Sequence, residues 1–123
     1  MTTPEDHRVG VLALCGDPKP MHTLLDHLRQ LGYSVDTAGD LQDARTSFFG
    51  AGGHDCLVVG PDVQPGLAQR VVSSLKRVDP HIAVATFGPT VGLRAPLRSA
   101  RLASLHPSSR AGQGALLRFL RGL

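Results

Sequence analysis

Four side chains near the ends of apolar segments have types that could take part in chemistry. Cys15 follows an apolar run and His106 precedes a proline, and a thiol beside an imidazole can form a nucleophile with its base. Asp17 and Asp62 follow apolar runs, at positions where a carboxylate can bind a metal ion or cap the next helix. We favour the structural roles, in which Cys15 packs in the core and the aspartates cap helices.

The apolar pattern predicts the elements that must position these side chains. Short apolar runs closed by glycine, proline or aspartate predict strands buried on both faces, and apolar residues at every third or fourth position predict helices. The expected strands cover residues 8–15, 33–38, 54–59, 81–87 and 102–107, and the expected helices cover 20–31, 40–49, 65–78 and a last segment capped by Ser108 or Ser109. Because prolines and glycines interrupt residues 88–101, the fourth helix should be short or irregular. This alternation predicts an α/β fold with a parallel sheet and helices on both faces.

Length and composition predict one globular domain. At 123 residues and 13.0 kDa the chain suits a single core, so we expect residues 1–123 to form one domain with a flexible N-terminus at 1–7. Apolar residues make up 41% of the chain but form no run long enough to cross a bilayer. The polar, acidic segment 1–7 is unlike a secretion signal. The two cysteines and the histidine spacing predict no disulfide framework, no metal site and no cofactor, and we expect a cytoplasmic protein.

Charge is distributed unevenly along the chain. Residues 1–80 contain all ten acidic residues and seven basic ones, whereas residues 81–123 contain six arginines and no acidic residue. The asymmetry predicts that the C-terminal third faces an acidic partner or surface. A basic face that is simply solvated would have the same pattern.

The order and spacing of the segments resemble the receiver domain of bacterial response regulators over almost the whole chain. Cys15-Gly16-Asp17-Pro18 follows the first strand where that family has an acidic pair, and Leu31 to Val35 (LGYSV) resembles the close of its first helix. Gly60 falls at the position of the phosphoacceptor aspartate, and Thr86 at that of a hydroxyl residue that contacts the phosphoryl group. Ser99-Ala100 followed by Leu105-His106-Pro107 resembles the family's last strand, with His106 in place of a lysine.

The resemblance implies a doubly wound five-stranded sheet of order 2-1-3-4-5 whose phosphorylation site is degenerate. Aspartyl phosphorylation needs a carboxylate nucleophile, a magnesium ion held by further carboxylates, and a lysine. Of the family's phosphorylation-site residues the chain keeps the hydroxyl residue, Thr86, and lacks the others, so we expect an atypical receiver that is not an enzyme. The degenerate pocket would contain Cys15, Gly16, Asp17, Gly60, Asp62, Thr86 and His106.

In receivers, the surface of the fourth helix, fifth strand and fifth helix is the usual docking and dimerisation face. The resemblance places several arginines of this chain there, and arginine pairs with carboxylates through two parallel hydrogen bonds. We therefore expect a protein partner with an acidic surface, or a homodimer, at this face. Its candidate contact residues are Arg94, Arg98, Arg101, Arg118 and Arg121.

Other functions stay open at this point. The crevice at the carboxyl ends of the strands could bind a small molecule or an anion, as in other open α/β sheets. Asp62 could replace Gly60 as phosphoacceptor if the register shifts by two residues. Cys15 could carry a phosphoryl group as in sugar phosphotransfer proteins, but the prolines after it remove backbone donors. The basic third could bind nucleic acid, against which the scarcity of lysine and aromatic residues argues.

Overall fold

The computed structural model describes residues 9–88 and 99–123 and contains the predicted parallel sheet. The sheet has five strands in the order β2-β1-β3-β4-β5, and every neighbouring pair is parallel. The strands are β1 (Gly10–Leu14), β2 (Ser34–Ala38), β3 (Cys56–Val59), β4 (Ala83–Thr86) and β5 (Ser99–Arg101). The helices are α1 (His22–Gln30), α2 (Leu41–Gly50), α3 (Pro65–Val78) and α4 (Arg110–Arg121), and the 3-10 turn η2 (Lys19–Met21) leads into α1.

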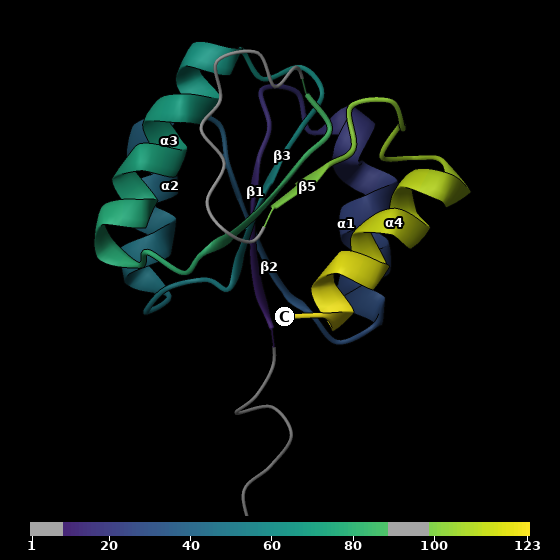
Figure 1. The fold of residues 1–123 in the computed structure, drawn as a ribbon, viewed down its shortest axis with the longest axis horizontal. Coiled ribbons are helices and arrows are strands. Elements are labelled where there is room, and N and C mark those ends of the chain that lie inside the picture. The colour runs from purple at the N-terminus through teal and green to yellow at the C-terminus, as the bar shows by residue number, and fades with distance from the viewer. Residues whose placement is uncertain (1–8, 89–98) are drawn as a thin grey trace, which may run out of the picture.

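Helices cover both faces of the sheet, α2 and α3 on one side and α1 and α4 on the other (Figure 1). Residues alternate between the two covered faces along each strand, so the central strands are apolar except for Thr86 at the end of β4. In β1, Val11 and Ala13 belong to the cluster packed by α1 and α4, whereas Leu12 and Leu14 belong to the cluster packed by α2 and α3. The continuous apolar runs of the sequence are therefore strands buried on both faces, as predicted.

Polar side chains at the helix starts also follow the sequence. The Asp40 side chain accepts a hydrogen bond from the Asp43 N–H at 2.7 Å and caps α2, as expected. Ser109 caps α4 in the same way through the Gly112 N–H, and Pro65 occupies the first turn of α3, where its missing N–H costs nothing.

The fifth strand is the main correction to the sequence-based fold. It lies at Ser99–Arg101 and not at 102–107, and beyond it the Leu105 N–H donates to the Leu102 carbonyl and closes a turn. As an edge strand it packs with one face, so it needs no apolar run, and the apolar pattern favoured the following segment. Of the segment 88–101, where a short or irregular helix was expected, residues 99–101 belong to β5 and residues 89–98 lie outside the described residues, as does the expected flexible N-terminus. The α4 of the structure is therefore the last helix of the sequence-based prediction.

No helix in the described parts of the chain is both long and apolar enough to cross a membrane.

Candidate functional site

The carboxyl ends of the strands bring two of the predicted loops together. Leu14 lies in register with Val59, and Val59 with Thr86, so the segments that follow β1 and β3 begin at the same level of the sheet. These segments are Cys15-Gly16-Asp17 and Gly60-Pro61-Asp62. They form the part of the predicted pocket that the structure assembles, and we call it the carboxyl-edge cluster.

The carboxylate of Asp62 connects the two loops. Its Oδ2 accepts a hydrogen bond from the Asp17 N–H, across the gap between the loop after β3 and the loop after β1. Asp17 turns its own carboxylate to the Lys19 N–H, at 3.0 Å, where it supports the start of η2. Asp17 therefore bonds to its own loop but is not the N-cap residue of η2 or α1, and Asp62 ties the loops together and is not the N-cap of α3, so neither aspartate caps a helix as we favoured.

Glycines at positions 16 and 60 make room for this carboxylate. A Cβ atom on Gly60 would lie 3.3 Å from Asp62 Oδ1 and 3.2 Å from the Leu14 carbonyl oxygen, and one on Gly16 would lie 3.0 Å from Asp62 Oδ2. These distances are shorter than comfortable van der Waals contact. The Asp62 carboxylate thus borders the space that a side chain at position 60 would enter.

Cys15 is poorly suited to nucleophilic chemistry in this setting. Its side chain is 5% exposed, and burial together with the nearby charges of Asp62 and Asp17 raises the pKa of the thiol. Because the thiolate is the reactive form, a raised pKa keeps the sulfur inert at neutral pH. Cys56, in the core, has its pKa raised to about 12, chiefly by burial. Both thiols therefore have the properties of packing residues.

Thr86 is buried, and its hydroxyl contacts its own loop. Its Oγ1 accepts a hydrogen bond from the Gly88 N–H at 3.1 Å, and it lies 3.4 Å from the Gly88 carbonyl oxygen. Gly88 in turn lies against the end of β3, since a Cβ atom there would be 2.9 Å from the Gly60 carbonyl oxygen. The threonine thus holds the turn after β4, and the structure describes no bond from it to Asp17 or Asp62.

His106 lies in the turn that starts α4. Its ring Nδ1 accepts from the Ser108 N–H at 3.1 Å and lies 2.6 Å from the Ser108 hydroxyl, and its carbonyl oxygen accepts from the Ser109 hydroxyl at 2.7 Å. The side chain is exposed, and its described contacts are all local. The structure therefore describes no pairing of His106 with Cys15.

The carboxyl-edge cluster contains few ligands for a metal ion. Asp17 and Asp62 supply its carboxylates, and within residues 9–88 and 99–123 there is no group of three or more histidine, cysteine, aspartate or glutamate side chains that could hold a metal ion. Magnesium prefers oxygen ligands such as carboxylates. Here Oδ2 of Asp62 already accepts a hydrogen bond from the Asp17 N–H.

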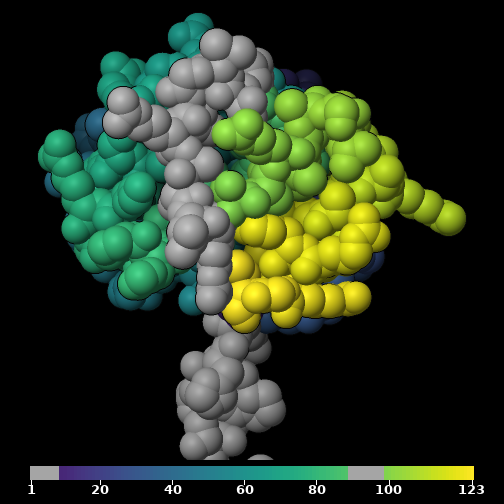
Figure 2. Space-filling view, viewed as in Figure 1, coloured from purple at the N-terminus to yellow at the C-terminus, as the bar shows by residue number. Residues whose placement is uncertain are grey.

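The predicted basic face is described in part. Arg101, Arg118 and Arg121 are exposed, and Arg94 and Arg98 lie outside the described residues. Figure 2 shows that α4 and the segment after β5 form one continuous surface on the viewed face. Ala100 and Leu102 pack in the cluster that contains α4, so Arg101 leaves β5 on the opposite side from that helix. Arg101 and the α4 arginines therefore flank the edge strand from its two sides.

Sequence reasoning missed a buried histidine. His54 precedes β3 and is 5% exposed, and its Nε2 lies 2.8 Å from Asp36 Oδ2 on β2. The ring passes over Gly10, where a Cβ atom would lie 3.7 Å from the imidazole Cδ2, and packs 5.8 Å from the Phe48 ring. A carboxylate only accepts hydrogen bonds, so Nε2 carries the proton and Nδ1 has no partner among the described residues.

Comparison with solved structures shows the fold. CheY4, a chemotaxis response regulator of Vibrio cholerae, matches with a TM-score of 0.67 at 14% identity, over 94% of this chain and 98% of that one. A two-component response regulator from Legionella pneumophila gives 0.63 at 14% identity, over 94% of this chain and 100% of that one. A pilus assembly-related protein from Burkholderia pseudomallei gives 0.61 at 20% identity, over 98% of this chain and 94% of that one.

The chain therefore has the doubly wound fold of response-regulator receiver domains, with the predicted strand order. No protein-family model matches its sequence, and no curated protein matches it either. At identities of 14% to 20% the structural likeness concerns the fold, and the function must be argued from the site.

Proposed function

We propose that this chain is a receiver-like regulatory module that acts by protein contact and does not use aspartyl phosphorylation. The observation that carries the proposal is the Asp62 carboxylate, which borders the space above Gly60 and accepts the Asp17 N–H. A phosphoryl group needs an unobstructed carboxylate, a metal ion beside it and a cation to pair with its oxygens. Here the end of β3 has no side chain, and the neighbouring carboxylate holds two loops together.

The same geometry argues against the crevice as an anion site. Asp17 and Asp62 place two negative charges at its mouth. Burial chiefly raises the pKa of the Cys15 thiol, and these two charges raise it further, so they disfavour another negative charge there. A phosphocysteine at position 15 would meet the same repulsion. Of the functions considered, we therefore favour contact with a protein partner.

The partner surface that we propose is the exposed basic face of α4 and β5. Arg118 and Arg121 are exposed on α4, and Arg101 is exposed on the opposite side of the neighbouring edge strand β5. The salt bridges found in the described parts of the chain pair Arg29, and no other arginine, with a carboxylate. Unpaired guanidinium groups are well suited to an acidic protein surface, because each can form two parallel hydrogen bonds with a carboxylate. The structural neighbours named as response regulators are consistent with a regulatory role.

Intact mass spectrometry tests the absence of phosphorylation. The protein is incubated with acetyl phosphate and Mg²⁺ beside Asp62→Asn and Asp17→Asn, with a phosphorylatable receiver as positive control. We expect no adduct on the wild-type chain or on either variant. An adduct on the wild type that Asp62→Asn removes and Asp17→Asn keeps would show that Asp62 is a phosphoacceptor, and the proposal would be wrong.

A further inference from the structure

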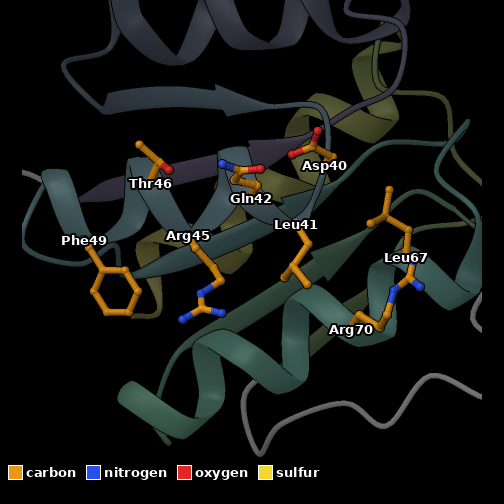
Figure 3. Close-up of a pocket in the computed structure, with 8 residues that line it drawn as sticks. All are labelled: Asp40, Leu41, Gln42, Arg45, Thr46, Phe49, Leu67 and Arg70. Carbon is orange, nitrogen blue, oxygen red and sulfur yellow. The ribbon is translucent and has the colours of Figure 1, made fainter.

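The outer surface of α2 and α3 has a groove that the proposed function does not use. The groove has a volume of about 580 Å³ and lies between the two helices (Figure 3). From α2, the side chains of Leu41, Arg45 and Phe49 extend toward α3, which contributes Leu67 and Arg70. Because residues four apart share one side of a helix, the α2 residues form a single row that alternates between apolar and basic side chains.

The groove continues along α3. A second hollow of about 510 Å³ shares Leu41, Arg45 and Arg70 with the first and adds Arg77. A third, of about 370 Å³, joins Phe49 to Val78 at the carboxyl ends of the two helices. The three hollows run along the helix pair, and we call this surface the α2–α3 groove.

Large apolar side chains are unusually exposed at one end of this groove. Phe49 and Val78 are each 53% exposed, and the one other large apolar side chain exposed to this degree in the described residues is Leu31. Within α3, Val71, Val72 and Leu75 are buried, whereas Val78 is not. Val78 is the last residue of α3 and lines the third hollow beside Phe49, so its side chain is not covered by the core.

The charge of the groove is positive and is not balanced from within. Arg45 lies 6.0 Å from the centre of the Phe49 ring, a cation–π distance, and none of the described salt bridges involves Arg45, Arg70 or Arg77. Asp40 is the carboxylate in the first hollow, and its Oδ1 already accepts from the Asp43 N–H. Asp79 borders the third hollow, and its Oδ1 accepts from the His81 N–H.

We propose that the α2–α3 groove binds an acidic amphipathic helix of a partner protein. Apolar side chains on one side of such a helix would cover Phe49, Leu67 and Val78, and glutamate or aspartate on its flanks would pair with the groove arginines. The elongated, open shape suits a helix better than a small ligand, which usually occupies an enclosed cavity. This surface lies across the sheet from α4, so the inference goes beyond the proposed function and does not depend on it.

The test uses a designed helical peptide as probe. One 18-residue peptide has leucine or phenylalanine at every third or fourth position and glutamate elsewhere, and its matched control has lysine in place of each glutamate. Both are titrated into the full ¹⁵N-labelled chain, and amide shifts are recorded. We expect the glutamate peptide to shift residues 41–49 and 66–78, and the lysine peptide to bind at least tenfold more weakly. Equal binding of both peptides, or no binding, would overturn the proposal.

Charge-reversed variants locate the contact. Arg45→Glu/Arg70→Glu should weaken binding of the glutamate peptide at least tenfold, whereas Arg29→Glu/Arg110→Glu, which makes the same change of charge on α1 and α4, should change it less than twofold. Circular dichroism confirms that each variant is folded. Phe49→Ala should weaken binding as well, because it removes the exposed ring. Unchanged affinity in the first variant would overturn the proposal.

Two further outcomes separate this inference from docking on α4 and β5 and from dimerisation. If Arg101→Glu/Arg118→Glu/Arg121→Glu abolishes binding and Arg45→Glu/Arg70→Glu does not, the peptide docks on the basic face of α4 and β5, which supports the proposed function and overturns the inference. If the wild type dimerises in sedimentation equilibrium and Phe49→Ala makes it monomeric, the occupant of the groove is a second copy of the chain, and the inference is equally wrong.

Discussion

The carboxyl edge of the sheet and the outer surface of α2 and α3 differ in whether their polar side chains have partners within the chain. At the edge, Asp62 accepts from Asp17 and joins two loops, and Thr86 accepts from Gly88 within its own loop. On the outer surface, Arg45 has no described carboxylate partner, and Phe49 is half exposed beside it. Open α/β sheets usually bind ligands at the edge. In this chain the described carboxylates at the edge accept hydrogen bonds from their own loops, whereas the arginines of the outer surface have no described carboxylate partner.

Replacing one glycine of each region by alanine should give the largest difference between the two regions in the free energy of unfolding. Gly88→Ala places a Cβ atom 2.9 Å from the Gly60 carbonyl oxygen, a backbone atom that cannot swing aside, so we expect a loss of about 3 kcal/mol in the free energy of unfolding. Gly66→Ala, in the first turn of α3, meets nothing within 4 Å and should be neutral or stabilising by about 0.5 kcal/mol. Urea unfolding of both variants measures this contrast, and equal losses would contradict it.

Introducing an aspartate at the end of β3 should destabilise the carboxyl edge by a smaller amount. The Gly60→Asp side chain would enter the space beside the Asp62 carboxylate, where both contact and like charge oppose it, and we expect a loss of about 2 kcal/mol. Combining it with Asp62→Ala should recover about half of that loss, because the competing carboxylate is gone. A double-mutant cycle in urea measures the coupling. Strictly additive losses would mean that the two positions do not compete.

The smallest expected effect concerns the Cys15 thiol. The charges of Asp62 and Asp17 help to raise its pKa, so removing one charge in Asp62→Asn should lower that pKa and increase the thiolate fraction at a given pH. We expect iodoacetamide to alkylate Cys15 in the folded variant roughly threefold faster than in the wild type at pH 8. Peptide mapping separates Cys15 from Cys56, and the urea-unfolded proteins, which should react alike, are the control. A slower or unchanged rate would show that burial alone controls the thiol.

The helices and the three central strands could be predicted from the sequence, because each gives a strong local pattern. β1, β3 and β4 are apolar runs, apart from Thr86 at the end of β4, since both faces are covered, and α3 repeats its apolar residues with helical spacing. β5 could not be placed in the same way. Ser99–Arg101 contains no apolar run, and its pairing with β4 is decided by backbone hydrogen bonds to a strand more than ten residues earlier in the chain.

The candidate site was predicted in part. Sequence spacing placed Cys15, Asp17 and Asp62 at the mouth of the sheet, and the structure brings them together. The sequence could not show that Asp62 would tie the two loops, nor that the His106 ring would bond to Ser108 in the turn before α4. Both facts depend on side-chain directions within loops, where no periodic pattern fixes which atoms meet.

The sequence by itself determined the layers of this protein, since the spacing of apolar residues sets which face of each helix and strand is buried. It also determined that no aspartate stands at the end of β3. The tertiary structure alone decided which groups meet across the fold: His54 with Asp36 over Gly10, Asp62 with Asp17, and the row from Leu41 to Phe49 beside Arg70. Contacts of this kind join residues far apart in the chain, and their geometry follows from packing elements against each other, which local propensity does not contain.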